Sequence, residues 1–217
     1  MGYRTVKKET KDEFIEKKST FIGHIKRVQN EEEAKEFINQ VKSDHREARH
    51  NVYAYVIGEN LGVQRYSDDG EPQGTGGIPV LEVIKKAEIT DVCVVVTRYF
   101  GGILLGAGGL TRAYTKGASI AIKASGIIEK VKAARVSIEI DYELLGKLQY
   151  LIEQKGWFLE EIGYMERVFI KVIGEEKANK ELLEEVTALS KGKAVCKVED
   201  YGLYFKDEGK YLEKFHP

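Results

Sequence analysis

Apolar residues in the first 70 positions recur at spacings that predict strands and one helix. Residues 19–28 predict a strand, and Asn30 is suited to cap a helix in the sequence EEEAKEFINQV, whose apolar side chains recur at helical spacing. Three consecutive glutamates in the first turn suit the positive end of the helix dipole. Residues 51–58 and 62–67 then predict two strands joined by a short turn.

Two glycine-rich loops, residues 67–77 and 101–109, separate the elements that follow. Pro79 suits the first turn of a helix after the first of these loops. The continuous apolar stretch at residues 92–100 predicts a strand buried on both faces. The second loop leads directly into residues 110–126, which predict a helix with a glycine at its C-terminus.

From about residue 127 the predicted elements follow the order strand, helix, strand, strand, helix, strand. Over about 80 residues this βαββαβ order is typical of a ferredoxin-like sandwich. We therefore expect an α+β protein of two domains, residues 1–126 and residues 127–217. The expected elements of the second domain are strands at 134–142, 157–163, 166–174 and 193–205, and helices at 143–155 and 175–190.

Composition and charge narrow the class of protein. Of the 217 residues, 42% are hydrophobic, which is enough for a sizeable core. The 34 basic and 35 acidic residues give a net charge of −1, which excludes a generally basic nucleic-acid binder but not a local basic patch. Cys93 and Cys196 lie far apart in apolar runs, which is unlike a disulfide framework or a structural zinc site. Without a signal-peptide pattern or an apolar run of about 18 residues, we expect a soluble, cytoplasmic protein that does not enter a membrane.

The segment from Val94 to Tyr114 has the strand, glycine loop and helix order that phosphate sites use. It matches no standard fingerprint, because Gly109 is followed by Leu110 and Thr111 instead of the Lys and Ser or Thr of a P-loop. Thr111 also stands where a dinucleotide fingerprint has its third glycine. Two hypotheses stay open for this loop: a site for an anion or other ligand, and a tight turn that needs positive φ angles.

Charged side chains accompany both loops, and three cations lie near the second. Arg112 and Lys116 are four residues apart and share a helix face. With Arg98 they either bind phosphate or form ion pairs with the acidic residues of the first loop, and in both cases the two loops must lie together. The acidic residues in question are Asp68, Asp69 and Glu71.

The sequence supports a metal site or a catalytic site less well than it supports a phosphate site. The acidic residues of the first loop could hold a divalent cation, but their spacing is not that of an EF-hand, and adjacent aspartates often form turns and helix caps. His45 and His50 form no HExxH pair, so we expect no metal ion and no cofactor. His50 could transfer a proton or could be a hydrogen-bonded structural residue. No serine lies in a GxSxG elbow, so an enzyme stays an alternative without a declared catalytic motif.

Two long motifs identify the chain as similar to the IMPACT family, in particular to its bacterial members of the YigZ type. They are SDDGEPQGTGGIPVLEVI at 67–84 and VVVTRYFGGILLGAGGLTRAYTKGA at 94–118, with AxHNVYAY upstream at 48–55. The resemblance covers essentially the whole chain. It implies an N-terminal α/β domain similar to domain IV of elongation factor G and a ferredoxin-like C-terminal domain similar to its domain V.

Carried over residue by residue, the family signature gives the candidate binding residues. In and around the first loop they are His50, Ser67, Asp68, Asp69, Gly70, Glu71, Pro72, Gly74, Thr75 and Gly77. Around the second loop they are Thr97, Arg98, Tyr99, Gly101, Gly102, Gly106, Gly109, Leu110, Arg112 and Tyr114, to which the charge pattern adds Lys116.

The resemblance also implies a role in translation. Eukaryotic relatives compete for the activator of a kinase that senses amino-acid starvation, but they do so with a recognition domain that this chain lacks, so we do not expect that partner. Our leading hypothesis is a non-enzymatic, translation-associated protein that binds RNA, a ribosomal component or another phosphate-bearing partner through residues 98–116. The alternative is an enzyme for a small phosphorylated or peptide substrate, with His50, Asp68, Asp69 and Arg98 around one cleft. A protein-interaction module would instead need an exposed apolar patch.

Overall fold

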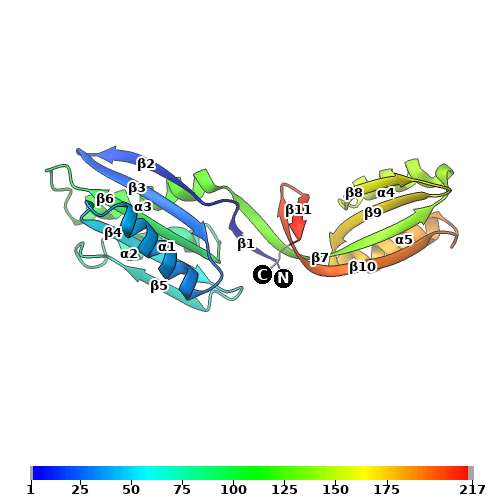
Figure 1. Cartoon of the computed structure of the whole chain (residues 1–217), viewed down its shortest axis with the longest axis horizontal. Helices are drawn as coiled ribbons and strands as arrows, with labels where there is room; N and C mark the ends of the chain where they lie inside the picture. Colours follow the sequence, from blue (N-terminus) through cyan, green and yellow to red (C-terminus); the bar gives the residue numbers. More distant parts are fainter. Residues whose placement is uncertain (1, 215–217) are drawn as a thin grey trace. The chain divides into compact units, whose positions relative to one another are not determined.

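The computed structural model describes residues 2–214, and the chain divides into two compact units. One unit comprises Tyr3–Ile128, and the other contains the chain from Glu129 onward (Figure 1). The assignment of residues 1–126 and 127–217 to two independently folding domains stays a prediction. Among the residues that the structure describes, no helix is long and apolar enough to cross a membrane.

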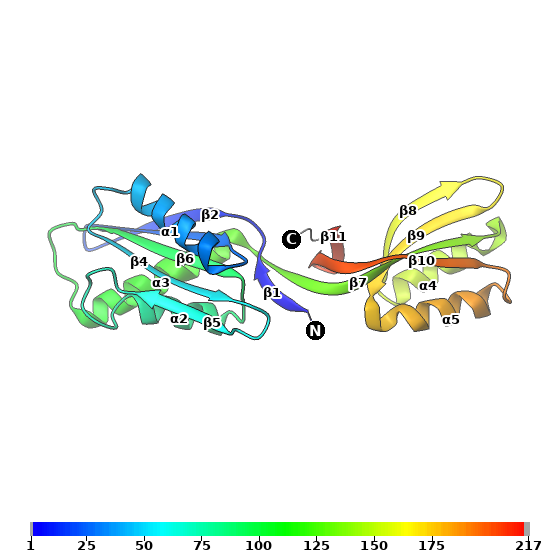
Figure 2. The same cartoon turned by 60° about the horizontal axis from the view of Figure 1, so that its bottom comes forward.

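The N-terminal unit is a five-stranded antiparallel sheet with helices on both faces. Its strand order is β2-β3-β6-β4-β5, which places β6 at the centre. Helix α1 covers one face, and helices α2 and α3 cover the other, as Figure 2 shows. The elements are β1 (Tyr3–Val6), β2 (Thr10–Glu16), β3 (Ser19–Arg27), α1 (Glu31–Asp44), β4 (His50–Ile57), β5 (Val63–Ser67), α2 (Gly77–Lys86), β6 (Val92–Tyr99) and α3 (Ala107–Ser125).

The central strand β6 is buried on both faces, as its apolar sequence predicts. Val94 and Val96 pack under α2 and α3, whereas Cys93 and Val95 pack under α1. Side chains of a strand alternate between the two faces of a sheet. The same alternation continues to the polar end of β6 and determines on which face each of its polar side chains lies.

Helix α1 begins as the sequence predicts. Asn30 accepts a hydrogen bond from the backbone N–H of Glu33 at 2.9 Å, and the Glu33 carboxylate accepts one from the backbone N–H of Gln29 at 2.9 Å. These reciprocal bonds satisfy two backbone donors that a helix start would otherwise leave free. The helix buries Phe37, Ile38 and Val41 against the sheet.

Helix α3 lies unusually close to the sheet because glycines meet at the contact. A Cβ on Gly23 of β3 would lie 2.1 Å from the carbonyl oxygen of Gly117, and a Cβ on Gly117 would lie 2.7 Å from a methyl carbon of Val96. At Gly23 a side chain would require the backbone to move, and at Gly117 it would displace the buried side chain of Val96. The close approach fixes α3 along β3 and β6 and so fixes the position of its N-terminus.

The C-terminal unit has the predicted ferredoxin-like arrangement, and the predicted fold class is confirmed. Its strands pair in the order β11-β10-β7-β9-β8, all antiparallel, with α4 and α5 packed on one face. The apolar core on that face includes Ile138, Leu148 and Ile170. The elements are β7 (Ile127–Ile140), α4 (Leu145–Gln154), β8 (Phe158–Tyr164), β9 (Val168–Glu175), α5 (Asn179–Leu189), β10 (Val195–Asp207) and β11 (Lys210–Lys214), with 3₁₀ turns at Tyr142–Leu144 and Glu176–Ala178.

Three strands are absent from the predicted elements, and several boundaries differ, among them the starts of β7 and α3. Strands β1, β2 and β11 have no counterpart among the predicted elements. Strand β2 is an edge strand with the largely polar sequence TKDEFIE, so it lacks a strong apolar alternation. Strand β7 begins seven residues earlier than predicted. Helix α3 begins at Ala107 and not at Leu110, because Gly108 and Gly109 are weak helix formers and the sequence pattern therefore assigns them to the loop.

The C-terminal unit should fold without the rest of the chain. A fragment of residues 130–217 keeps the core formed by β7 to β10 and by α4 and α5. At about 0.7 kcal/mol per residue, we expect one cooperative calorimetric transition with an enthalpy of about 60 kcal/mol. Absence of a cooperative transition in the fragment, with one present in the full chain, would contradict independent folding.

Candidate functional site

In the structure the first loop comprises residues 68–76, because Ser67 ends β5 and Gly77 begins α2, and it is folded around the carboxylate of Asp68. This carboxylate accepts hydrogen bonds from the backbone N–H groups of Gly74, Gly76 and Gly77 at 2.8–2.9 Å. Partial burial opposes ionisation, but these three bonds outweigh it, and the pKa of Asp68 lies below its ordinary value. Asp68 therefore holds the loop and the start of α2 together.

Asp69 ties the first loop to β4 and to α1. Its carboxylate accepts a hydrogen bond from the backbone N–H of Asn51 at 2.6 Å and pairs with the Lys42 ammonium group at 2.6 Å. Its carbonyl oxygen lies 2.8 Å from Nδ1 of His50. The two aspartates are thus fully engaged in shaping the loop.

Ser67 and Thr75 also contribute to the shape of the loop. The Ser67 hydroxyl oxygen accepts a hydrogen bond from the backbone N–H of Asp69 at 3.1 Å. The Thr75 hydroxyl donates to the carbonyl oxygen of Pro72 at 2.6 Å. Both side chains close short turns, as Ser and Thr commonly do.

Glu71 is the acidic residue that reaches the second loop region. Its Oε1 atom accepts a hydrogen bond from Nη1 of Arg98 at 2.6 Å and another from the Tyr114 hydroxyl at 2.7 Å. The Glu71 and Arg98 side chains are only 4% and 6% exposed, so this is a buried ion pair. Burial raises the pKa of Tyr114, and the Glu71 charge raises it further, so the phenol stays protonated and donates. The predicted proximity of the two loops is therefore observed, through Glu71 rather than through an aspartate.

A cavity of about 380 Å³, which we call the loop cavity, opens beside this ion pair. The N-terminus of α3 borders it at Gly106 and Ala107. Gly106 has a φ of 70°, which favours glycine, and it provides no side-chain cap for the first N–H groups of α3. The lining residues are Arg49, His50, Glu71, Pro72, Arg98, Phe100, Leu104, Leu105, Gly106, Ala107 and Leu110.

Arg98 and Phe100 form the boundary between the buried ion pair and the surface. Nε of Arg98 is buried and has no hydrogen-bond partner within residues 2–214. The guanidinium carbons of Arg98 and Arg49 lie 5.4 and 5.7 Å from the ring centre of Phe100. Phe100 is 38% exposed, so one aromatic side chain with two neighbouring cations lies at the rim of the loop cavity.

Arg112 and Lys116 lie in a second, smaller depression of about 180 Å³ beside the first half of α3. They are exposed, as is Lys17 in the turn between β2 and β3, which lines the same depression. The Lys116 ammonium group lies 4.2 Å from the ring centre of Phe14. Leu105 of the second loop lines both this depression and the loop cavity, so the two hollows adjoin at this residue.

The remaining signature residues lie elsewhere. Thr97 and Tyr99 point to the α1 face of the sheet, opposite to Arg98, because strand side chains alternate. The Thr97 hydroxyl donates to the side-chain oxygen of Asn51 at 2.7 Å, and Tyr99 Oη lies 2.8 Å from Nδ1 of His45. Gly101 lies against the backbone of Lys18, Gly102 is exposed, and Gly109 lies in the first turn of α3.

Sequence reasoning missed three side chains of this region: Arg49, Phe100 and Lys17. Arg49 and Phe100 each flank a signature residue, His50 and Gly101, so their positions next to the motifs were the available signal. Lys17 belongs to the unpredicted β2–β3 turn. Within residues 2–214, no three His, Cys, Asp or Glu side chains come together as a metal site.

Replacing Asp68 by Ala should destabilise the N-terminal unit, because three backbone N–H groups lose a charged acceptor. We expect a loss of about 2 kcal/mol in the free energy of unfolding at pH 7, measured by urea denaturation. The folded-state pKa is lowered, so this stability is complete above the ordinary pKa and is lost as the pH falls through the lowered value. A difference between wild type and variant that persists unchanged in strong acid would contradict this role.

Replacing Glu71 by Ala should cost more, about 3–5 kcal/mol, because the buried Arg98 charge is left without a partner. Tyr114→Phe should cost less, about 1–2 kcal/mol, since it removes one hydrogen bond and leaves the ion pair. Glu36, exposed on α1, provides the control: Glu36→Ala should change stability by less than about 0.5 kcal/mol. Equal effects of Glu71→Ala and Glu36→Ala in urea denaturation would rule out a structural ion pair.

The sequence and the structure of this chain were compared with known protein families and solved structures. Residues 17–122 match the family model of the Impact N-terminal domain, and residues 138–193 match a domain of unknown function, DUF1949. A solved structure described as a hypothetical protein is 28% identical, with a TM-score of 0.59, and the match covers 92% of this chain and 98% of that chain.

Two bacterial relatives extend the match over most of the sequence. The IMPACT family member YvyE of Bacillus subtilis is 44% identical over 213 residues, which are 98% of this chain and 94% of the relative. The IMPACT family member YigZ of Escherichia coli is 34% identical over 158 residues, which are 72% of this chain and 78% of the relative. This chain belongs to the IMPACT family.

Proposed function

We propose that this protein acts in association with translation by binding single-stranded RNA, with one nucleotide in the loop cavity. The observation that carries the proposal is the combination found there: the N-terminus of α3, which Gly106 leaves without a side-chain cap, and an exposed aromatic ring beside two guanidinium groups. A helix N-terminus binds phosphate, and an aromatic ring stacks on a base. These are the two recurring parts of a nucleotide.

The electrostatics of the region suit a phosphate chain. At the N-terminus of α3, backbone N–H groups and the helix dipole favour an anion, and Gly108 is exposed in the first turn. Arg49 is exposed at the cavity rim, whereas the charge of Arg98 is balanced by Glu71. Arg98 therefore adds little net charge for a phosphate, and Arg49 is the cation that the cavity rim presents.

The cations in the second depression extend the same path. Lys17, Arg112 and Lys116 line the second depression, Arg49 lines the loop cavity, and Leu105 of the second loop lines both. A strand whose first phosphate lies at α3 could place the next phosphates beside these three cations. Family membership supports the link to translation, because the resemblance implies translational regulation among eukaryotic relatives.

One observation favours an enzyme as the second candidate. His50 Nδ1 lies 2.8 Å from the carbonyl oxygen of Asp69, so Nδ1–H donates there and leaves Nε2 unprotonated in the neutral ring. Nε2 lies 4.0 Å from Glu71 Oε1, and His50 lines the loop cavity. An oriented imidazole in a cavity is a geometry for a general base acting on a small phosphorylated substrate.

Short single-stranded RNAs should bind with modest affinity and with a salt dependence set by few cations. Arg49, Lys17, Arg112 and Lys116 could neutralise about four phosphates, so the log–log salt slope should be no steeper than about −3. Arg112→Ala should make the slope shallower by about 0.7. Phe100→Ala should weaken binding by about 1–3 kcal/mol and leave the slope unchanged, because it removes stacking and no charge. Fluorescence titrations at several salt concentrations measure both quantities.

Lys35→Ala is the matched control, since Lys35 is an exposed cation on α1, on the opposite face of the sheet. It should leave affinity and slope at the wild-type values. If wild type binds no RNA at low salt, or if Lys35→Ala and Arg112→Ala have equal effects, the RNA proposal fails. Hydrolysis of a phosphorylated substrate that His50→Gln abolishes would then support the enzyme.

A further inference from the structure

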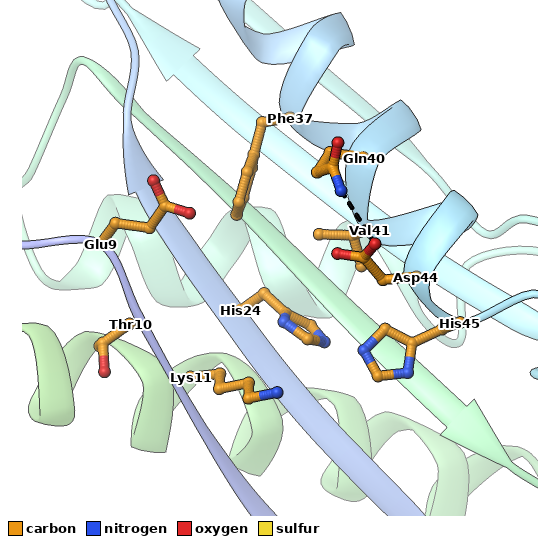
Figure 3. A pocket seen from close by; sticks show the side chains of 9 residues that line it. All are labelled: Glu9, Thr10, Lys11, His24, Phe37, Gln40, Val41, Asp44 and His45. Atoms are coloured by element: carbon orange, nitrogen blue, oxygen red, sulfur yellow. Dashed lines mark hydrogen bonds between the residues drawn. The ribbon is translucent and has the colours of Figure 1, made fainter.

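A second cavity, of about 590 Å³, lies on the α1 face of the N-terminal sheet. We call it the histidine cavity, because His24 of β3 and His45 at the end of α1 lie side by side in it (Figure 3). Arg98, Glu71 and Tyr114 belong to the opposite face, so the proposed RNA site uses neither histidine.

His24 is buried without a partner for one of its nitrogens. The residue is 7% exposed, and its Nε2 atom makes no hydrogen bond within residues 2–214. A buried polar atom without a partner costs free energy, so its retention calls for an explanation. Figure 3 shows a ring nitrogen of His24 turned toward His45.

The hydrogen bond of His45 to Tyr99 leaves its other ring nitrogen available as a ligand. Its Nδ1 lies 2.8 Å from Tyr99 Oη, and when Nδ1–H donates to that oxygen, Nε2 is left with a free lone pair. A hydrogen bond from the far nitrogen to an oxygen is the support that histidine ligands of metal ions commonly have. The signature residue Tyr99, which does not line the loop cavity, would thus orient the ring of His45.

The spacing of the two rings matches that of two histidines on one metal ion. With a metal–nitrogen distance of about 2.1 Å and about 1.1 Å from nitrogen to ring centre, a tetrahedral angle places the ring centres about 5.2 Å apart. The centres of His24 and His45 are 4.9 Å apart, with an angle of 60° between the ring planes.

Charged side chains surround the two histidines. Glu9, Asp44 and Lys11 line the histidine cavity (Figure 3). Glu9 is paired with Lys26 at 3.1 Å, and Asp44 accepts a hydrogen bond from the side-chain amide of Gln40 at 2.8 Å. Burial, and after it the positive charges of His45 and Lys11, lower the pKa of His24 to about 4.

We propose that His24 and His45 bind one divalent transition-metal ion, of the class of Zn²⁺, between their imidazole nitrogens. The protein supplies two ligands, since within residues 2–214 no third His, Cys, Asp or Glu side chain completes a site, and water occupies the remaining positions. The site is therefore of moderate affinity, and it is separate from the RNA site in residues and in face.

The test is a calorimetric titration of the untagged full-length protein with Zn²⁺, together with NMR spectra of the histidine side chains. We expect one saturable site per chain and Zn²⁺-dependent shifts of the ring nitrogens of His24 and His45. His45→Ala should weaken binding about tenfold or more, and because His45 is half-exposed at a helix end the variant should still fold. Tyr99→Phe should weaken binding less, through the lost orientation of His45.

His50→Gln is the control, since His50 lies outside the histidine cavity, and it should bind Zn²⁺ as wild type does. Lys11→Gln should tighten binding, because it removes a cation near the proposed ion. The proposal is overturned if the wild-type protein shows no saturable Zn²⁺ binding. That result is expected if the two imidazoles share a proton instead of a metal ion. The proposal is also overturned if His45→Ala binds as wild type does. Neither outcome affects the RNA titrations.

Discussion

The buried ion pair between Glu71 and Arg98 is the interaction on which the arrangement of the loops depends. It joins the end of the central strand to the first loop, and Tyr114 adds a hydrogen bond from the first half of α3. Isolated burial of either charge would cost several kcal/mol, so each side chain requires the other in place. The pair therefore couples strand, loop and helix, and the loop cavity exists only where all three meet.

Strand alternation distributes the family signature over two faces of one sheet. Arg98 lies on the α2 and α3 face with the loop cavity, whereas Thr97 and Tyr99 lie on the α1 face. One continuous motif in the sequence thus serves two sites in the structure: a proposed RNA site and a proposed metal site. The aspartates of the first loop serve neither ligand directly, because Asp68 and Asp69 are used to fold the loop.

The elements with strong periodicity could be predicted from the sequence, and those with weak apolar patterns could not. The fully apolar β6 and the capped α1 are examples of the first kind. The polar edge strand β2 and the first turn of α3, which contains Gly108 and Gly109, are examples of the second. For the site, the charge pattern left two possibilities for Arg98: phosphate binding, or an ion pair with an acidic residue of the first loop. The choice of Glu71 over Asp68 depends on the path of the loop, which no local pattern encodes. Phe100 and Arg49 are 51 positions apart in the sequence, and they come together only because the fold brings the end of β6 beside the start of β4.

The central claim is that the two loops and the start of α3 form one RNA-binding site, and chemical-shift mapping tests it most directly. Backbone amide spectra of the ¹⁵N-labelled full-length protein would be recorded during a titration with a short single-stranded RNA. The account predicts that the largest shifts fall on Phe100 and on the amides of Ala107, Gly108 and Gly109, with the α1 face unchanged. Shifts confined to the C-terminal unit, or the absence of shifts at the start of α3, would contradict it.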